Sequence, residues 1–268
     1  MNFTNDSMTA LAVRDLTDGL RAVHVWGMLG WQDIKQRYRR SLLGPLWLTL
    51  STAVMVVSLG LVYASIFKMP LEQYFPFLAI GLVVWTLIST SITEGCQVFI
   101  SSEPVIKQIR LPFSVHACRC LWRNAIILGH NMIIIVAIVV MFQPGVSLGL
   151  LLLLIPSLVL IFLSGLWVTL LLGMICARFR DVPQVISSVL QIVFFLTPII
   201  WHPSLLSGRQ RVVYWNPLYH YVELIRMPLL GEAPSAHTWI MTVAITVLGW
   251  CFTFAFFRRF RGRIAYWV

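Results

Sequence analysis

The chain has 268 residues, of which 59% are hydrophobic and 11% are charged, and its formal net charge at pH 7 is +10. A soluble domain of this length needs far more polar surface, so the composition excludes a water-soluble globular protein. No segment forms a soluble basic domain, so a nucleic-acid partner is not expected, and the positive charge suits helix ends that meet anionic membrane lipids.

Residues 1–45 form an N-terminal arm in which we expect an amphipathic helix from about Leu16. Four of its residues recur on one stripe at helical spacing: Trp31, Ile34, Tyr38 and Leu42. Such a helix lies in the plane of the membrane interface with its apolar face towards the lipid. Gly44-Pro45 is expected to end it before the first span, because proline disfavours helical geometry in the preceding residue.

Six long apolar stretches follow. They are Leu46–Phe67, Phe75–Thr93, Ala125–Phe142, Val146–Ala177, Val182–Trp201 and Trp239–Phe257. A helix needs about 20 apolar residues to cross the hydrocarbon core. The sequence therefore predicts an all-α integral membrane protein with a six-span domain over residues 46–258, followed by a tail over residues 259–268.

Two connections on the side of the N-terminus contain charged residues. Residues 101–112 predict a short helix parallel to the membrane, with Ser102 at its N-cap and Pro104 in its first turn, although an ordinary loop is the alternative. In residues 177–183, Arg178, Arg180 and Asp181 are placed to cap adjoining helix ends. Asp181 is expected to N-cap the fifth span, where a negative charge suits the helix dipole.

Residues 202–237, between spans five and six, are too polar to cross the membrane. Asn216 followed by Pro217 is a helix-start signal, and Glu223 is spaced to pair with Arg226. We expect short re-entrant helices here, dipping into the outer leaflet or covering a pore mouth; a plain surface helix is the alternative.

The lysines and arginines fix the expected orientation. With both termini in the cytoplasm, 16 of the 20 basic residues lie inside and four, Lys68, Arg209, Arg211 and Arg226, lie outside. Short positively charged loops resist translocation, so this orientation is preferred.

Few polar groups lie within the apolar stretches. Glu94 is expected to pair with a basic residue such as Arg123 or to face a water-filled cavity, and His130-Asn131 is expected to pack between helices. The pair Cys118 and Cys120 lacks the further ligands of a zinc site, so no metal site is expected. The chain has no phosphate-binding loop for ATP. A membrane-embedded glycan-modifying enzyme is the alternative class, and it would have to use His130 or Glu94.

Several segments together resemble a known family. Residues 31–47, with the sequence WQDIKQRYRRSLLGPLW, are similar to the start of the membrane subunit of ABC-2-type polysaccharide exporters. Residues 177–182, 194–199 and 215–226 agree with that family in the same order. The ending RGRIAYW at residues 261–267 is similar to that of O-antigen exporters.

The resemblance implies a homodimer of this chain in the bacterial inner membrane, working with two copies of a separate ATPase that binds ATP and Mg. This chain then needs no cofactor of its own and has no catalytic residues. The absence of an internal repeat also favours a pathway formed by two copies. The cargo implied is a polysaccharide on undecaprenyl diphosphate or another lipid anchor, and the resemblance favours lipopolysaccharide O-antigen. Capsular polysaccharide and teichoic-acid-type polymers are alternatives, and a drug or small-lipid exporter is a further one.

Site roles follow from the resemblance and from position. The residues expected to transmit ATPase motion are Trp31, Ile34, Tyr38, Lys107, Arg110, Arg180 and Asp181. Those expected to attract a lipid diphosphate at the cytoplasmic entrance are Arg37, Arg39, Arg119 and Arg123, because arginine binds phosphate in a bidentate manner. The exterior gate is expected at Tyr214, Trp215, Asn216, Pro217, Glu223 and Arg226. The flat rings expected to stack on sugars along the pathway are Trp85, Phe99, Trp122, Phe194 and Phe195.

Overall fold

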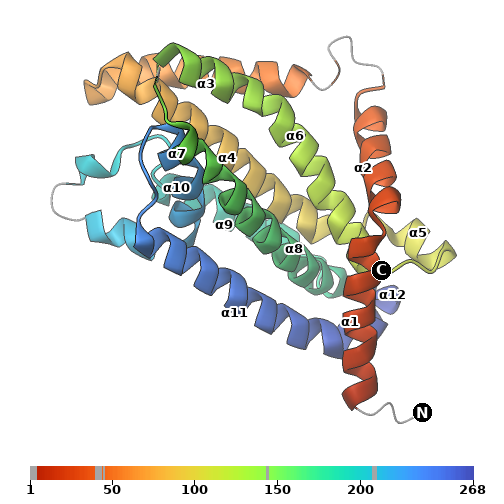
Figure 1. Cartoon of the computed structure of the whole chain (residues 1–268). Helices are drawn as coiled ribbons and strands as arrows, with labels where there is room; N and C mark the ends of the chain where they lie inside the picture. Colours follow the sequence, from red (N-terminus) through yellow and green to blue (C-terminus); the bar gives the residue numbers. More distant parts are fainter. Residues whose placement is uncertain (1–4, 40–43, 45, 143–144, 207–209) are drawn as a thin grey trace.

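The computed structural model describes residues 5–39, 44, 46–142, 145–206 and 210–268, and every regular element in this part of the chain is a helix (Figure 1). The α-helices are α1 (Asn5–Arg21), α2 (Val23–Arg37), α3 (Leu46–Phe67), α4 (Leu71–Gln97), α5 (Glu103–Gln108), α6 (Phe113–Phe142), α7 (Leu148–Leu152), α8 (Leu154–Arg178), α9 (Val182–Leu196), α10 (Pro217–Leu229), α11 (Ala236–Phe260) and α12 (Ile264–Trp267). Three short 3₁₀ helices are η1 (Pro203–Leu205), η2 (Gln210–Trp215) and η3 (Arg261–Arg263).

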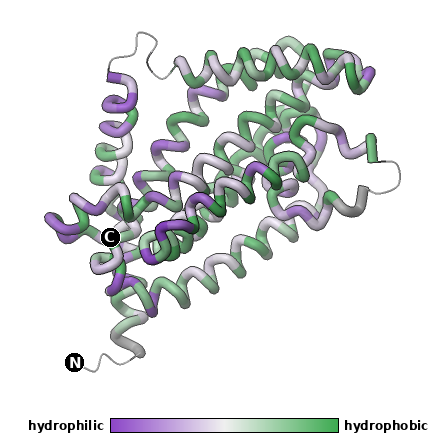
Figure 2. The backbone as a smooth tube through the Cα atoms, turned by 180° about the vertical axis from the view of Figure 1, so that it is seen from behind, coloured by the Kyte–Doolittle hydropathy of each residue, from purple (hydrophilic) through white to green (hydrophobic). Residues whose placement is uncertain are grey.

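Five helical segments of the described chain are long and apolar enough to cross a membrane. They are Leu46–Phe67, Leu71–Gln97, Phe113–Phe142, Leu148–Arg178 and Ala236–Trp267. The bounds of the first are those expected from the sequence. The third begins at Phe113 rather than Ala125, because the charged residues of its first turns find partners in other helices, as described below. Figure 2 shows these long helices as mainly hydrophobic, with hydrophilic residues gathered at the end that carries both termini.

Helix α9 is shorter than the fifth span expected from the sequence. It ends at Leu196 instead of Trp201. Its 15 residues measure about 22 Å, less than the roughly 30 Å of a bilayer core. Pro198 has no N–H to continue the helix, and the Thr197 hydroxyl donates to the carbonyl of Val193 at 2.7 Å. A sixth crossing therefore stays a prediction.

The N-terminal arm forms two helices that follow one another across one end of the bundle (Figure 1). The arm is helical well before Leu16, and α1 and α2 are separated at Ala22. Helix α2 lies close against α6 because Gly30 has no side chain: a Cβ there would lie 2.9 Å from Cδ1 of Trp122. Leu42 and Pro45, expected at the end of the arm, lie outside the described residues.

Helix α4 forms the centre of the molecule, packed against α3, α6, α8 and α10. Tyr74, Leu78 and Ile80 on this helix are completely buried. Helix α10 lies with η1 and η2 at the end of the bundle opposite the termini, whereas α1, α5 and α12 lie at the same end as the termini (Figure 1). The first half of α4 meets α10, where Arg226 lies over Phe77, and Phe99, directly beyond its other end, shares a core with Ala12 of α1 and Ile264 of α12.

Candidate functional site

A groove of about 460 Å³ lies between α3, α4 and α9. One wall carries a row of hydroxyl groups about one turn apart on α4: Thr86, Ser89, Thr90 and Thr93. Thr86, Thr90 and Thr93 each donate to a backbone carbonyl four residues earlier, at 2.8, 2.6 and 2.9 Å. Their oxygens therefore keep lone pairs that can accept hydrogen bonds from a molecule in the groove.

Three of the five aromatic residues expected along a pathway meet in this groove. The ring centroids of Trp85 and Phe194 are 5.5 Å apart, and those of Phe194 and Phe195 are 5.3 Å apart. Phe195 is 63% exposed. Aromatic surface and hydroxyl groups therefore line the same groove.

The structure places the other two aromatic residues elsewhere. Phe99 is completely buried, where its ring packs edge-on against Phe113. Trp122 packs edge-on against Trp26 of the arm, with ring centroids 5.9 Å apart. In helices that are apolar on every side, ring spacing alone does not indicate which rings share a face.

Helix α9 presents a polar face to the outside of the single chain. Gln184, Ser187, Ser188 and Gln191 recur at helical spacing, and Ser187, Ser188 and Gln191 are exposed. Ser187 and Gln191 also line the groove. This face of α9 therefore forms a polar border of the groove.

A cluster of five charged residues, here called the charge cluster, joins α2, α4 and α6 near the end of the bundle that carries the termini. It consists of Arg37 and Asp33 on α2, Glu94 on α4, and Arg119 and Arg123 on α6. Arg119 donates through two nitrogens to the carboxylate of Asp33, one of them at 2.8 Å, and Arg123 donates to Asp33 at 2.8 Å. Glu94 accepts from Arg123 at 2.7 Å and from Arg37 at 2.9 Å. Burial would raise the pKa of Asp33, but the guanidinium groups of Arg119 and Arg123 hold it below its ordinary value.

The predicted ion pair of Glu94 with Arg123 is thus confirmed, and three of the four arginines expected at the entrance meet here. The fourth, Arg39, is exposed and lies beyond the end of α2. Asn131 is buried as expected, but His130 bonds the carbonyl of Ile126 in its own helix at 2.8 Å rather than a group on a neighbouring helix. No hydrogen bond connects Glu94 with His130 in the described part of the chain.

The residues expected to transmit ATPase motion lie on α2, on α5 and between α8 and α9. On α2, Ile34 is buried and Trp31 is exposed, and the half-buried Tyr38 follows directly after the helix. On α5, Lys107 pairs with Glu103 at 2.6 Å, and Arg110 beyond it is exposed.

The connection between α8 and α9 touches the C-terminal segment, where Arg180 donates to the carbonyl of Trp267 at 3.1 Å. Asp181 precedes α9 as expected, but its side chain makes no capping hydrogen bond, so that prediction was wrong. Its backbone is helical (φ −90°, ψ −24°), whereas an N-cap residue that bonds the first turn is usually extended.

Asp15 is a functional candidate that no sequence pattern indicates. Its carboxylate accepts from the backbone N–H groups of Phe113 and Ser114 at 3.2 and 3.1 Å, from the Ser114 hydroxyl at 3.0 Å, and from Nε of Arg261 at 2.8 Å. It thus caps α6 from 98 residues away and ties both terminal segments to the start of that helix. Local spacing contains no signal for such a contact.

At the opposite end, Glu223 and Arg226 form the predicted ion pair at 2.8 Å. Arg226 is completely buried, 3.9 Å from the ring centre of Phe77, and donates to the carbonyl of Pro198 at 2.9 Å. A Cβ at Gly81 would overlap its guanidinium, so α4 needs a glycine there. Burial raises the pKa of Glu223 above its ordinary value, although Arg226 opposes this.

The other residues expected at the exterior gate surround the start of α10. Asn216 caps α10 as predicted, accepting from the N–H of Leu218 at 3.0 Å, and Pro217 opens the helix. Tyr214 and Trp215 are exposed, Trp215 by 84%.

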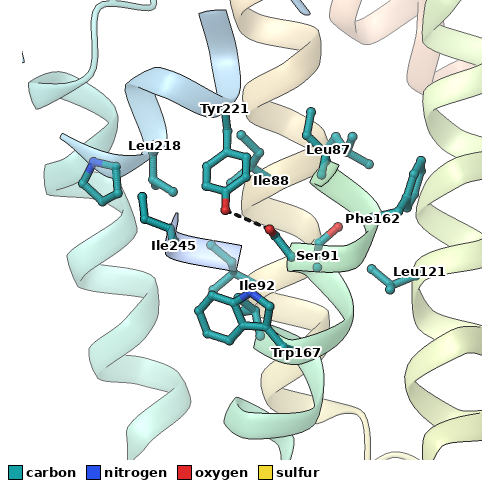
Figure 3. A pocket seen from close by; sticks show the side chains of 15 residues that line it. Leu87, Ile88, Ser91, Ile92, Leu121, Phe162, Trp167, Leu218, Tyr221 and Ile245 are labelled. Atoms are coloured by element: carbon teal, nitrogen blue, oxygen red, sulfur yellow. Dashed lines mark hydrogen bonds between the residues drawn. The ribbon is translucent and has the colours of Figure 1, made fainter. Parts of the chain in front are cut away.

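A hollow of about 180 Å³ lies behind α10, between α4, α8 and α11 (Figure 3). Leu87, Ile88 and Ile245 line it, and Tyr221 points towards Ser164, with the two hydroxyl oxygens 2.8 Å apart. Its lining is almost wholly apolar, whereas that of the groove between α3, α4 and α9 has a larger polar share.

Comparison with known proteins shows the family to which this chain belongs. The model of the family described as ABC-2 type transporter matches residues 24–230. Three relatives carry the name "O-antigen export system permease protein RfbA". The one from Myxococcus xanthus is 27% identical over 70% of this chain and 73% of its own length. One from Klebsiella pneumoniae is 24% identical over 70% of this chain and 73% of its own length. A second from Klebsiella pneumoniae is 21% identical over 87% of this chain and 91% of its own length.

The family match covers most of the chain, including the groove, the charge cluster and α10. The chain therefore belongs to the ABC-2 type transporter family and is a multi-pass membrane transport subunit.

Proposed function

We propose that this chain is the permease subunit of an ATP-driven exporter that moves a lipid-linked polysaccharide across the bacterial inner membrane. Two copies form the passage, and two copies of a separate ATPase bind ATP and Mg and supply the energy. Both termini are cytoplasmic. The cargo is the polysaccharide of lipopolysaccharide O-antigen, the polymer that the names of the three relatives contain.

The groove between α3, α4 and α9 is the observation that carries this proposal. Sugars present C–H faces that pack on aromatic rings and hydroxyl groups that exchange hydrogen bonds. The groove offers both kinds of surface, with Trp85, Phe194 and Phe195 next to the hydroxyl row of α4. Because the polar face of α9 borders the same groove, a second copy facing it would enclose a polar passage between the two chains.

The short helices at the two ends of the bundle fit the remaining roles. Helices α2 and α5 and the connection around Arg180 receive the motion of the ATPase. Helix α10 and the residues before it close the exterior end, and the buried pair of Glu223 with Arg226 holds α10 against α4. The arginines of the charge cluster, with Arg39 beside it, receive the lipid diphosphate.

A deletion strain complemented with variants tests the proposal. Phe195 and Phe252 are almost equally exposed, at 63% and 61%, but only Phe195 lines the groove. Loss of an aromatic contact of about 1 kcal/mol should lower export roughly fivefold in Phe195→Ala, while Phe252→Ala should export normally. Electrophoresis of surface lipopolysaccharide, normalised to the amount of permease in the membrane, measures both.

The deletion itself identifies the cargo. Loss of the long lipopolysaccharide bands supports O-antigen, and loss of capsular polymer alone would move the assignment to capsule. A deletion strain in which every surface polymer is normal would refute the proposal.

A further inference from the structure

The charge cluster is almost neutral, although it contains three arginines. The three guanidinium groups face the two carboxylates of Asp33 and Glu94, which leaves one positive charge. An anion that approaches this end of the bundle therefore meets cations that already have partners. Taking the place of a carboxylate gives such an anion the guanidinium donors that the carboxylate now uses.

The two carboxylates are held differently. Asp33 accepts two bonds from Arg119 and one from Arg123, and its side chain is 15% exposed. Glu94 accepts one bond from Arg37 on α2, and two from Arg123 and one from Asn124 on α6, so it links these two helices to α4. The side chain of Arg37 is 42% exposed, so the bond between Arg37 and Glu94 is the most accessible of the cluster.

Glu94 also follows directly after Thr93, the last groove-lining residue of α4, although its own carboxylate faces α2 and α6. The bond between Glu94 and Arg37 therefore connects the N-terminal arm to the helix that forms one wall of the groove. A molecule that breaks this bond changes the connection between the arm and that wall.

We propose that the phosphate or diphosphate headgroup of a lipid replaces the carboxylate of Glu94 on Arg37 and Arg123, and that this exchange releases α2 from α4. The inference rests on the proposed function and adds how the substrate is sensed. A diphosphate carries more negative charge and more acceptor oxygens than a carboxylate, and arginine binds phosphate with two parallel hydrogen bonds. The exchange replaces hydrogen bonds and ion pairs and involves no covalent step.

The exchange gives the headgroup a way to shift a conformational equilibrium. A ligand favours one state only as far as it binds that state more tightly than the other. Here Arg37 and Arg123 can bind the headgroup fully only in the released state. Glu94 thus acts as a built-in competitor that keeps α2 bonded to α4 until a substrate arrives.

The test uses the purified permease with its ATPase in nanodiscs, and it measures ATP hydrolysis against the concentration of farnesyl diphosphate as a short lipid diphosphate. Glu94→Gln keeps the size of the side chain and removes the competing charge. We expect half-maximal stimulation of this variant at a roughly tenfold lower concentration than for the unmodified protein. Asp18→Asn is the matched control, because Asp18 pairs with Arg14 on α1 at the same end but lies outside the cluster and outside the residues assigned to ATPase coupling, and it should not change the response.

Three further measurements make the result decisive. Arg37→Gln should lose the response. Hydrogen exchange of residues 31–38 should increase with farnesyl diphosphate in the unmodified protein, and it also shows whether each variant is folded. Inorganic pyrophosphate and phosphatidylglycerol in the nanodisc separate free phosphate and bulk lipid from a lipid diphosphate. Stimulation by either one at the same concentration would overturn the assignment to a lipid diphosphate.

Equal half-maximal concentrations for Glu94→Gln, Asp18→Asn and the unmodified protein would refute the exchange. The exchange is refuted as well if farnesyl diphosphate stimulates none of them. The proposed function is judged separately, from the surface polymers of the deletion strain. If the deletion strain loses its polymer but Glu94→Gln responds to farnesyl diphosphate like the unmodified protein, only the exchange is refuted.

Discussion

Asp15 should be the residue that holds the N-terminal arm on the bundle, and Asp15→Ala is the change that tests it. The side chain is completely inaccessible and accepts from two backbone N–H groups, one hydroxyl and Arg261. An N-cap contributes about 1 kcal/mol, and a hydrogen bond to a charged group contributes about 1.5 to 3 kcal/mol. Together these predict a loss of about 2.5 to 4 kcal/mol in the free energy that docks α1 against α6.

Two other variants set the scale of this effect. Asp15→Asn keeps an oxygen that can accept from the N–H groups but loses the charge that faces Arg261, so it should cost about 1 to 3 kcal/mol. Asp18→Ala, one turn further along the same helix, removes an exposed pair with Arg14 and should cost less than about 1 kcal/mol.

Hydrogen exchange of the amides of Phe113 and Ser114 measures the docking directly, because these amides donate to Asp15. A loss of about 4 kcal/mol corresponds to exchange that is faster by roughly a factor of a thousand. If Asp15→Ala and Asp18→Ala accelerate exchange equally, the arm is held by its apolar contacts, and the reasoning from the carboxylate is refuted.

The remaining predictions concern two other charged groups. Arg226→Met leaves the carboxylate of Glu223 buried without a partner and should lower the free energy of unfolding by about 3 to 5 kcal/mol. The double variant Arg226→Met with Glu223→Gln should lower it clearly less. Unfolding in a detergent titration compares the two variants, and an equal loss of stability would contradict the pairing. The pKa of Asp33 is lowered in the folded protein, so its contribution to stability is complete above the ordinary value of 3.8 and is lost as the pH falls through the lower folded value. Hydrogen exchange of residues 31–37, corrected for the intrinsic pH dependence, should rise on that acidification in the unmodified protein, while Asp33→Asn should already be less protected at neutral pH and show no such rise.

Features that depend on residues close in the chain could be predicted from the sequence. Residues 46–67 are apolar almost throughout, and the helix there ends where expected because the charged Lys68, directly after it, does not suit the hydrocarbon core. The cap at Asn216 and the pair of Glu223 with Arg226 are also local, since they span two and three residues. Such contacts form whenever the helix forms, whatever the surroundings.

The tertiary structure decided which distant residues meet. Asp15 and Phe113 are 98 residues apart, and the sequence contains no period that relates them. Phe195 lines a groove while Phe99 is buried, although both lie among apolar residues, because only the packing of neighbouring helices fixes which face of an apolar helix is covered. The composition and the apolar stretches by themselves determined that this chain is a helical membrane protein. The positions of the groove, the charge cluster and the contacts of Asp15 followed only from how the helices pack, because polar contacts within a membrane depend on the partner that the fold supplies.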